Sequence, residues 1–323
     1  MKLFSKANIC WLLTIILTYG LLEGAVMVGL LDSFYEITLI NILINIILAV
    51  GLNLVVGYSG QLSLGHAGFM AIGAYATGIL TKQTPDFQTL LISIAVGMLI
   101  AGIVAFVVGV PTLRLQGDYL AIATLGVAEI IRIVILNLED LTNGAAGLSG
   151  IPFLANWRIA FGVMVVMLIL VINFTHGSIG RAIISVREDE IAAKSLGINT
   201  YYYKMLAFIL GAVTAAAAGS LHASYFSVIN PGQFTLDKSV DILIIVVFGG
   251  IGSMTGSVIS AVLLGILNTY LQQFGALRMI IYALVLVLIM IFKPGGLFGK
   301  KEWSFAKWLK SPKKSVAPEE SGV

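Results

Sequence analysis

A succession of long apolar runs separated by short polar segments constrains this chain more than any other feature of its sequence. A helix needs roughly 20 apolar residues to cross the hydrocarbon core of a bilayer, and most of the runs are close to that length. They predict an all-α, polytopic integral membrane bundle of about ten (eight to ten) transmembrane helices. The runs cover residues 9–30, 37–57, 66–81, 90–110, 119–138, 160–176, 205–227, 240–251, 256–272 and 277–292.

Charged residues are too few for a soluble protein. They make up 11% of the 323 residues, against about 25% in an average soluble domain, which excludes an ordinary cytoplasmic or secreted enzyme. The single cysteine, Cys10, excludes an intrachain disulfide. The three histidines show no metal-binding spacing. We therefore expect no metal and no cofactor in this chain, and no nucleic-acid partner.

The distribution of Lys and Arg predicts the orientation. With both termini in the cytoplasm, fourteen of the nineteen Lys and Arg fall on cytoplasmic segments, as the positive-inside rule requires. Seven of them follow residue 292, in a basic tail typical of segments that contact membrane lipid. The expected division is an N-terminal tail with the first transmembrane helix (1–36), a transmembrane domain (37–298), and a basic cytoplasmic tail that is partly disordered (299–323).

Small residues recur every four positions in several runs, as at Gly211, Ala215 and Gly219. Such spacing lets helix backbones approach closely within a membrane, so these faces are predicted to be helix–helix contacts. A glycine cluster at 249–256 lacks the lysine of a phosphate-binding loop. It predicts a tight turn between two short helices. Any energy that this chain uses must then come from a partner or an ion gradient.

Residues 177–204 form a polar cytoplasmic segment with seven charges in 28 residues. A short helix is predicted at about 188–196, with Lys194 four residues after Glu190 and Gly197 as its stop. Its acidic first turn comprises Glu188, Asp189 and Glu190. Its small apolar face comprises Ala192, Ala193 and Leu196. That face suits a narrow groove on another protein, and the alternative is a solvated connecting helix.

The pattern Glu190-x-Ala192-Ala193-x-x-x-Gly197 resembles the coupling-helix motif of ATP-binding-cassette importer permeases. It departs from that motif by the inserted Ile191 and by a missing later proline. Four further stretches are similar to the LivM-type permease subunit of branched-chain amino acid importers, so that the resemblance covers roughly residues 37–298. These stretches are 51–75, 114–132, 142–152 and 247–265.

The resemblance implies a transport permease in a bacterial inner membrane, not an enzyme. It would carry leucine, isoleucine and valine by alternating access, driven by ATP and Mg²⁺ on two cytoplasmic ATPase subunits. A second, LivH-like permease and an external substrate-binding protein would complete the complex. The alternatives are a same-fold importer for urea or a simple sugar, and an ion-coupled secondary transporter. A membrane-embedded enzyme is disfavoured because the chain has no paired carboxylates or nucleophile–base arrangement.

Two further patterns give candidates for the translocation path. Residues 57–68 interrupt an apolar region with glycines and with Gln61, Ser63 and His66, and broken helices often offer backbone amides to an anionic substrate group. The alternative is an ordinary turn with a satisfied histidine. Glu129 and Arg132 lie three residues apart within a run and can neutralise each other. Lys238 and Asp241 repeat that spacing. Ion pairs of this kind are more often structural than catalytic.

Overall fold

The computed structural model describes residues 6–29 and 32–275, and single positions beyond them as far as Gly299. Contacts divide the chain into two units, one formed by Ser33–Lys301 and one by Met1–Asp32 with Glu302–Val323. The second unit contributes helix α1 (Lys6–Met27), as expected for the first apolar run. All further elements belong to the first unit.

The first nine apolar runs coincide with helices, which confirms the all-α, polytopic class. After α1 these are α2 (Ser33–Asn53), α3 (His66–Gln83), α4 (Phe87–Thr112), α5 (Asp118–Asn137), α7 (Trp157–His176), α10 (Thr200–Phe226), α11 (Leu236–Gly249) and α12 (Met254–Leu271). Within the described residues, six segments are long and apolar enough to cross a membrane. The tenth run, 277–292, lies outside the continuously described residues.

Short elements lie between the long helices. They are η1 (Leu54–Tyr58), α6 (Glu139–Thr142), η2 (Gly144–Ala146), β1 (Leu148–Ser149), α8 (Ser178–Glu188), α9 (Glu190–Ser195), β2 (Val228–Ile229), η3 (Pro231–Gln233) and η4 (Gln272–Phe274). The two strands pair antiparallel, with Leu148 opposite Ile229. This pairing ties the turn-rich loop after α5 to the end of α10.

Close backbone contact between α3, α4 and α10 forms the centre of the bundle. A Cβ atom on Gly219 would lie 1.9 Å from the carbonyl oxygen of Met70, and one on Gly73 would lie 1.9 Å from that of Ala216. Gly97 of α4 also meets Gly73, since its Cβ would lie 3.1 Å from the Gly73 Cα. The small residues therefore act as predicted, by letting helices touch through their backbones.

The turn between α11 and α12 is fixed by Asn53 at the end of α2. Its Oδ1 accepts a hydrogen bond from the Gly252 N–H (2.9 Å), and its Nδ2 donates to the Ser253 carbonyl (2.9 Å) and to the Ser257 hydroxyl (2.8 Å). Gly250 and Gly252 adopt positive φ values of 115° and 88°, which side chains disfavour. The predicted tight glycine turn between two helices is confirmed.

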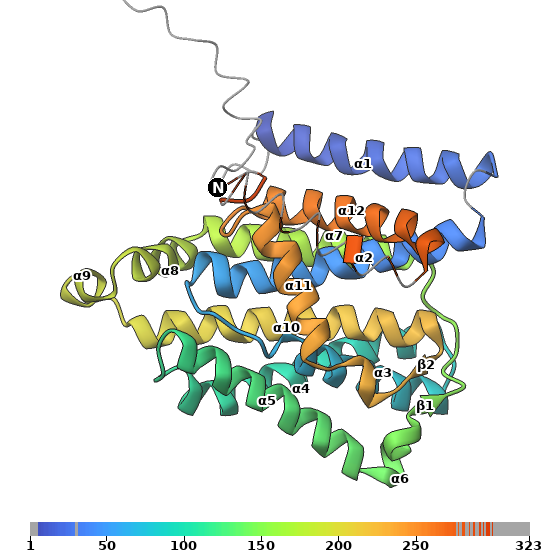
Figure 1. Ribbon diagram of the computed structural model, residues 1–323, viewed down its shortest axis with the longest axis horizontal. Coiled ribbons are helices and arrows are strands. Elements are labelled where there is room, and N and C mark those ends of the chain that lie inside the picture. The colour runs from blue at the N-terminus through green and yellow to red at the C-terminus, as the bar shows by residue number, and fades with distance from the viewer. Residues whose placement is uncertain are drawn as a thin grey trace, which may run out of the picture. The chain divides into compact units, whose positions relative to one another are not determined.

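The chain between α2 and α3 breaks the helical order inside the bundle. One π-helical turn, η1, follows α2, and residues 60–65 are then irregular before α3 begins at His66. At the start of α3, the Ala67 N–H donates to the Ser239 hydroxyl of α11 at 3.1 Å. Figure 1 shows α11, in orange, lying obliquely to α2, with which it is in contact. We call residues 57–66, from the end of η1 to the first residue of α3, the break.

Candidate functional site

The polar segment between α7 and α10 folds into two helices, where the sequence predicted one. Ile183 and Val186 are buried on one face of α8. The high charge of the segment had suggested a solvated stretch, so this amphipathic pattern was not recognised in the sequence. Glu188 ends α8, where it pairs with Arg187. The short helix predicted at about 188–196 is therefore α9, and it begins two residues later than expected. The chain extends at Asp189, and α9 begins at Glu190.

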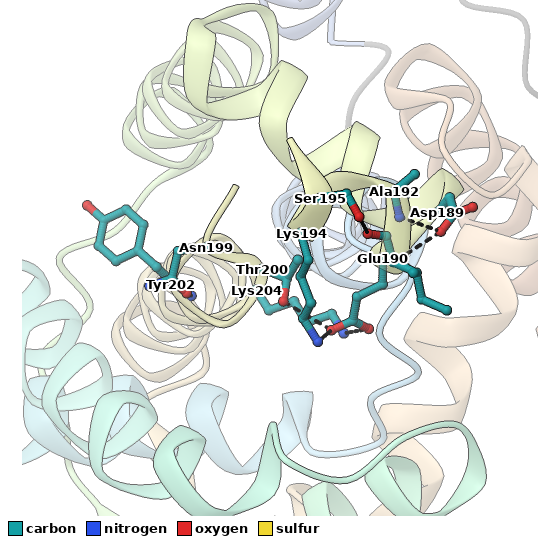
Figure 2. A network of polar contacts seen from close by, with 10 residues as sticks. Asp189, Glu190, Ala192, Lys194, Ser195, Asn199, Thr200, Tyr202 and Lys204 are labelled. Carbon is teal, nitrogen blue, oxygen red and sulfur yellow. Dashed lines mark hydrogen bonds and ion pairs between the residues drawn. The ribbon is translucent and has the colours of Figure 1, made fainter. Parts of the chain in front are cut away.

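Both ends of α9 are closed by local hydrogen bonds. The Asp189 carboxylate accepts from the Ile191 and Ala192 N–H groups at 2.9 and 3.0 Å, which satisfies two amides of the first turn (Figure 2). At the other end Gly197 has a φ of 80°, and its N–H donates to the Lys194 carbonyl. The glycine stop predicted from the sequence is confirmed.

The three residues of the predicted apolar face do not all point away from the bundle. Ala193 is buried with 2% exposure, whereas Leu196 is 81% exposed and Ala192 is exposed as well. Ile191, the residue inserted into the motif, is 79% exposed. The small Ala193 side chain faces the bundle, where it lets α9 pack closely. Its two large apolar side chains therefore point outward.

Glu190 joins α9 to the beginning of α10. Its carboxylate accepts hydrogen bonds from the Lys204 ammonium (2.6 Å) and the Thr200 hydroxyl (3.1 Å), and it pairs with Lys194 at 3.2 Å, as Figure 2 shows. The hydrogen bond from Lys204 is the main reason why the pKa of Glu190 falls from its usual 4.5 to about 2. The i,i+4 pair with Lys194 was predicted. The partner Lys204 was not, because ten residues and a turn separate Glu190 from α10.

The Glu190 contacts predict a pH dependence. A carboxylate with a lowered pKa stabilises the folded state above its usual pKa, and this contribution is lost as the pH falls from about 4.5 to about 2. We expect Glu190→Gln to lower the melting temperature of the purified protein at pH 7 by roughly 2–4 °C, for a loss of about 1 kcal/mol. The difference from wild type should shrink steadily below pH 4.5, and a difference that is independent of pH would contradict this role.

The same segment also contacts the break. The Arg187 guanidinium donates to the carbonyl of Gly57 at 2.6 Å, and the Gln61 amide donates to the carbonyl of Lys204 at 3.1 Å. A Cβ on Gly60 would lie 2.9 Å from Cγ of Arg187. Sequence reasoning missed Arg187 and Lys204, since nothing in the local sequence distinguishes them from solvated charges. The structure thus places α8 and the start of α10 directly against the break, with α9 packed on both of these helices.

The polar residues of the break are themselves buried. Gln61, Ser63 and His66 are all below 5% exposure, and the Ser63 hydroxyl accepts a long hydrogen bond of 3.4 Å from the Gly65 N–H. The His66 ring hydrogen-bonds the backbone of Leu48. The Gln61 amide also donates to the Ser59 hydroxyl. These contacts pair polar groups of the break with one another and with α2.

Glu129 and Arg132 do not join this cluster. They form the ion pair within α5 that their spacing predicted. Helix α5 meets the break through another residue, Thr124, whose hydroxyl accepts from the Leu64 N–H at 3.0 Å. In the part of the chain that the structure describes, no group of three or more His, Cys, Asp and Glu is arranged to hold a metal ion.

Comparisons with known proteins agree with the motifs. Residues 34–292 match the model of the family described as "Branched-chain amino acid transport system / permease component". The chain is 37% identical over 290 residues to the high-affinity branched-chain amino acid transport system permease protein LivM of Escherichia coli K12, covering 79% of this chain and 68% of that relative. It is 25% identical over 287 residues to LivH of the same organism, covering 79% and 91%. No solved structure gives a significant match.

Proposed function

Since the chain belongs to the family of branched-chain amino acid transport permease components, we propose that it is a transmembrane subunit of an ATP-binding-cassette importer for leucine, isoleucine and valine. It is a multi-pass membrane permease and not an enzyme. The observation that carries the proposal is the similarity to LivM along most of both chains. The five motifs named above fall inside the matched region.

The complex that this function requires has further parts. We assign to it a second permease similar to LivH, two cytoplasmic ATPase subunits that bind ATP and Mg²⁺, and an external substrate-binding protein. The chain would lie in the bacterial inner membrane with about ten spans and both termini in the cytoplasm, as the positive-inside pattern favours.

Coupling to the ATPase would pass through α9. Its exposed Ile191 and Leu196 offer apolar contacts to a cytoplasmic partner, and Glu190 links α9 to α10 through Lys204. Arg187 and Gln61 then connect the segment to the break. A displacement of α9 would therefore move α10 and the break together, and the path residues Gln61, Ser63 and His66 lie in or beside that break.

Reconstitution tests the function. We expect proteoliposomes that contain the complete complex and the binding protein to accumulate labelled leucine when ATP is supplied, and not with a non-hydrolysable ATP analogue. Leucine uptake by this chain alone under an ion gradient would support a secondary transporter instead. Uptake of urea or a sugar without uptake of leucine, isoleucine or valine would identify a sister importer of the same fold.

A further inference from the structure

Polar side chains from three helices line one open groove of the bundle. The groove has a volume of about 550 Å³, within the range of small-molecule sites. Its polar lining includes Thr38, Asn41 and Asn45 of α2, Lys238 and Asp241 of α11, and Asn268 of α12. None of these residues belongs to the break or to the α8–α9 segment. The groove is thus a separate feature of the molecule.

The contacts of α2 give the depth of the groove. Helices α2 and α12 run antiparallel, because Thr38 hydrogen-bonds Thr269 near one end (3.3 Å) and Asn53 bonds Ser257 near the other. Asn45 lies between these contacts, near the middle of the apolar segment Phe34–Tyr58. The Lys238 ammonium donates to Oδ1 of Asn45 at 3.2 Å. The charge of Lys238 therefore sits near the middle of the bundle.

Helix α11 also begins at this depth. Its 14 residues extend about 21 Å, too short to cross a core of about 30 Å. The hydroxyl of its Ser239 accepts a hydrogen bond from the Ala67 N–H at the start of α3. Both helices therefore start inside the bundle. Membrane transporters commonly place their substrate where helices start or end at mid-depth.

The polarity of this face is incompatible with lipid. A Lys or Asp at the centre of a membrane helix costs about 2.5–3.5 kcal/mol, and Asn41, Asp241 and Asn268 are exposed on the described chain. Water, another protein or a further part of this chain must therefore cover them. The groove runs from Asn45 to Phe34 and Gln272, so it reaches the end of the bundle where α2 begins and α12 ends.

We propose that this groove is a hydrated part of the amino acid's passage, in which Lys238 and Asp241 face the carboxylate and the ammonium of the zwitterion. The two side chains carry opposite charges one helical turn apart on α11. Ile42, Ile245 and Leu264 line the same groove and provide an apolar wall for an aliphatic side chain. This assignment rests on the proposed function and adds to it the residues that recognise the substrate.

Thiol labelling tests whether the groove holds water. The chain has a single cysteine, so Cys10→Ser gives a cysteine-free chain in the reconstituted complex. We expect Asn41→Cys and Asn268→Cys to react with a charged, water-soluble methanethiosulfonate, and saturating leucine with its binding protein and ATP to slow the reaction. Ile103→Cys, on an exposed apolar face of α4, is the lipid-facing control and should not react. If Asn41→Cys and Asn268→Cys react as little as Ile103→Cys, the groove is a dry interface and the proposal is wrong.

Charge substitutions test recognition. We expect Lys238→Met and Asp241→Asn each to lower leucine uptake at least tenfold, while complex assembly and ATP hydrolysis stimulated by the binding protein remain. Lys238→Arg, which keeps the charge, should retain most of the uptake. Lys82→Met, at the exposed end of α3, is the matched control for removal of a lysine.

The two proposals fail in different ways. If the wild-type complex shows no ATP-dependent leucine uptake, the proposed function is wrong. If wild type transports leucine and Lys238→Met and Asp241→Asn transport it equally well, the function stands and the groove assignment is wrong. If Lys238→Met and Asp241→Asn lose complex assembly together with uptake, and Lys238→Arg loses both as well, the two residues are structural. The groove assignment is then also wrong.

Discussion

Replacing Gly219 with leucine is expected to prevent the bundle from assembling. A Cβ atom at this position would meet the backbone of α3, at 1.9 Å from the Met70 carbonyl oxygen and 3.0 Å from the Ala74 nitrogen. Backbone atoms of a packed helix cannot rotate away as a side chain can, so α3 and α10 would have to separate. Overpacking a core with side chains alone already costs about 1–3 kcal/mol, and a clash between backbones exceeds that.

The measurement is the yield of monodisperse protein in detergent, with its melting temperature. We expect Gly219→Leu to give aggregated protein or none. Gly162→Leu is the matched control, because Gly162 lies inside α7 with nothing within 4 Å of its Cβ position. The control should be neutral or slightly stabilising, since leucine favours a helix by almost 1 kcal/mol over glycine. Wild-type yield and melting temperature for Gly219→Leu would refute the close packing of α3 on α10.

The double variant Ile191→Asp with Leu196→Asp is expected to abolish ATP-driven uptake while leaving the fold intact. Both side chains are about four-fifths exposed (79% and 81%), so their removal takes nothing from the core. Burial of such a side chain against a partner contributes about 1.5–3 kcal/mol. Losing two of them and adding two charges should weaken binding of the ATPase subunits more than a hundredfold.

Co-purification of the ATPase subunits and leucine uptake measure this effect. The control variant, Ile191→Met with Leu196→Met, keeps the apolar surface and should retain both. The melting temperature of the isolated permease should be the same in all three proteins, because the Glu190 contacts remain. Normal uptake by the aspartate variant would show that α9 does not bind the ATPase through these residues.

Much of the fold could be predicted from the sequence because its determinants are local. The length of each apolar run decides whether a helix can cross the membrane, and nine runs became helices within a few residues of the expected bounds. The Glu190–Lys194 pair and the Gly197 stop depend on contacts within one or two helical turns. The glycine turn after α11 was predictable for the same reason.

The orientation of α9 and the existence of α8 were not predictable in this way. Whether Ala193 or Leu196 faces the bundle depends on how closely α9 approaches α10, and the sequence of α9 alone does not contain that distance. Helix α8 has an apolar face with only a few residues, and its charges concealed the pattern. Packing, rather than local propensity, decided both features.

The sequence by itself determined that this chain is a helical membrane permease and which family it belongs to, because run length, small-residue spacing and motifs are properties of neighbouring residues. Only the tertiary structure decided which polar groups meet. Arg187 reaches Gly57 across 130 residues, Gln61 reaches Lys204 across 143, and Lys238 reaches Asn45 across 193. Such contacts depend on helix packing in three dimensions. The contacts between the α8–α10 region and the break therefore exist only in the folded bundle, and so does the polar groove.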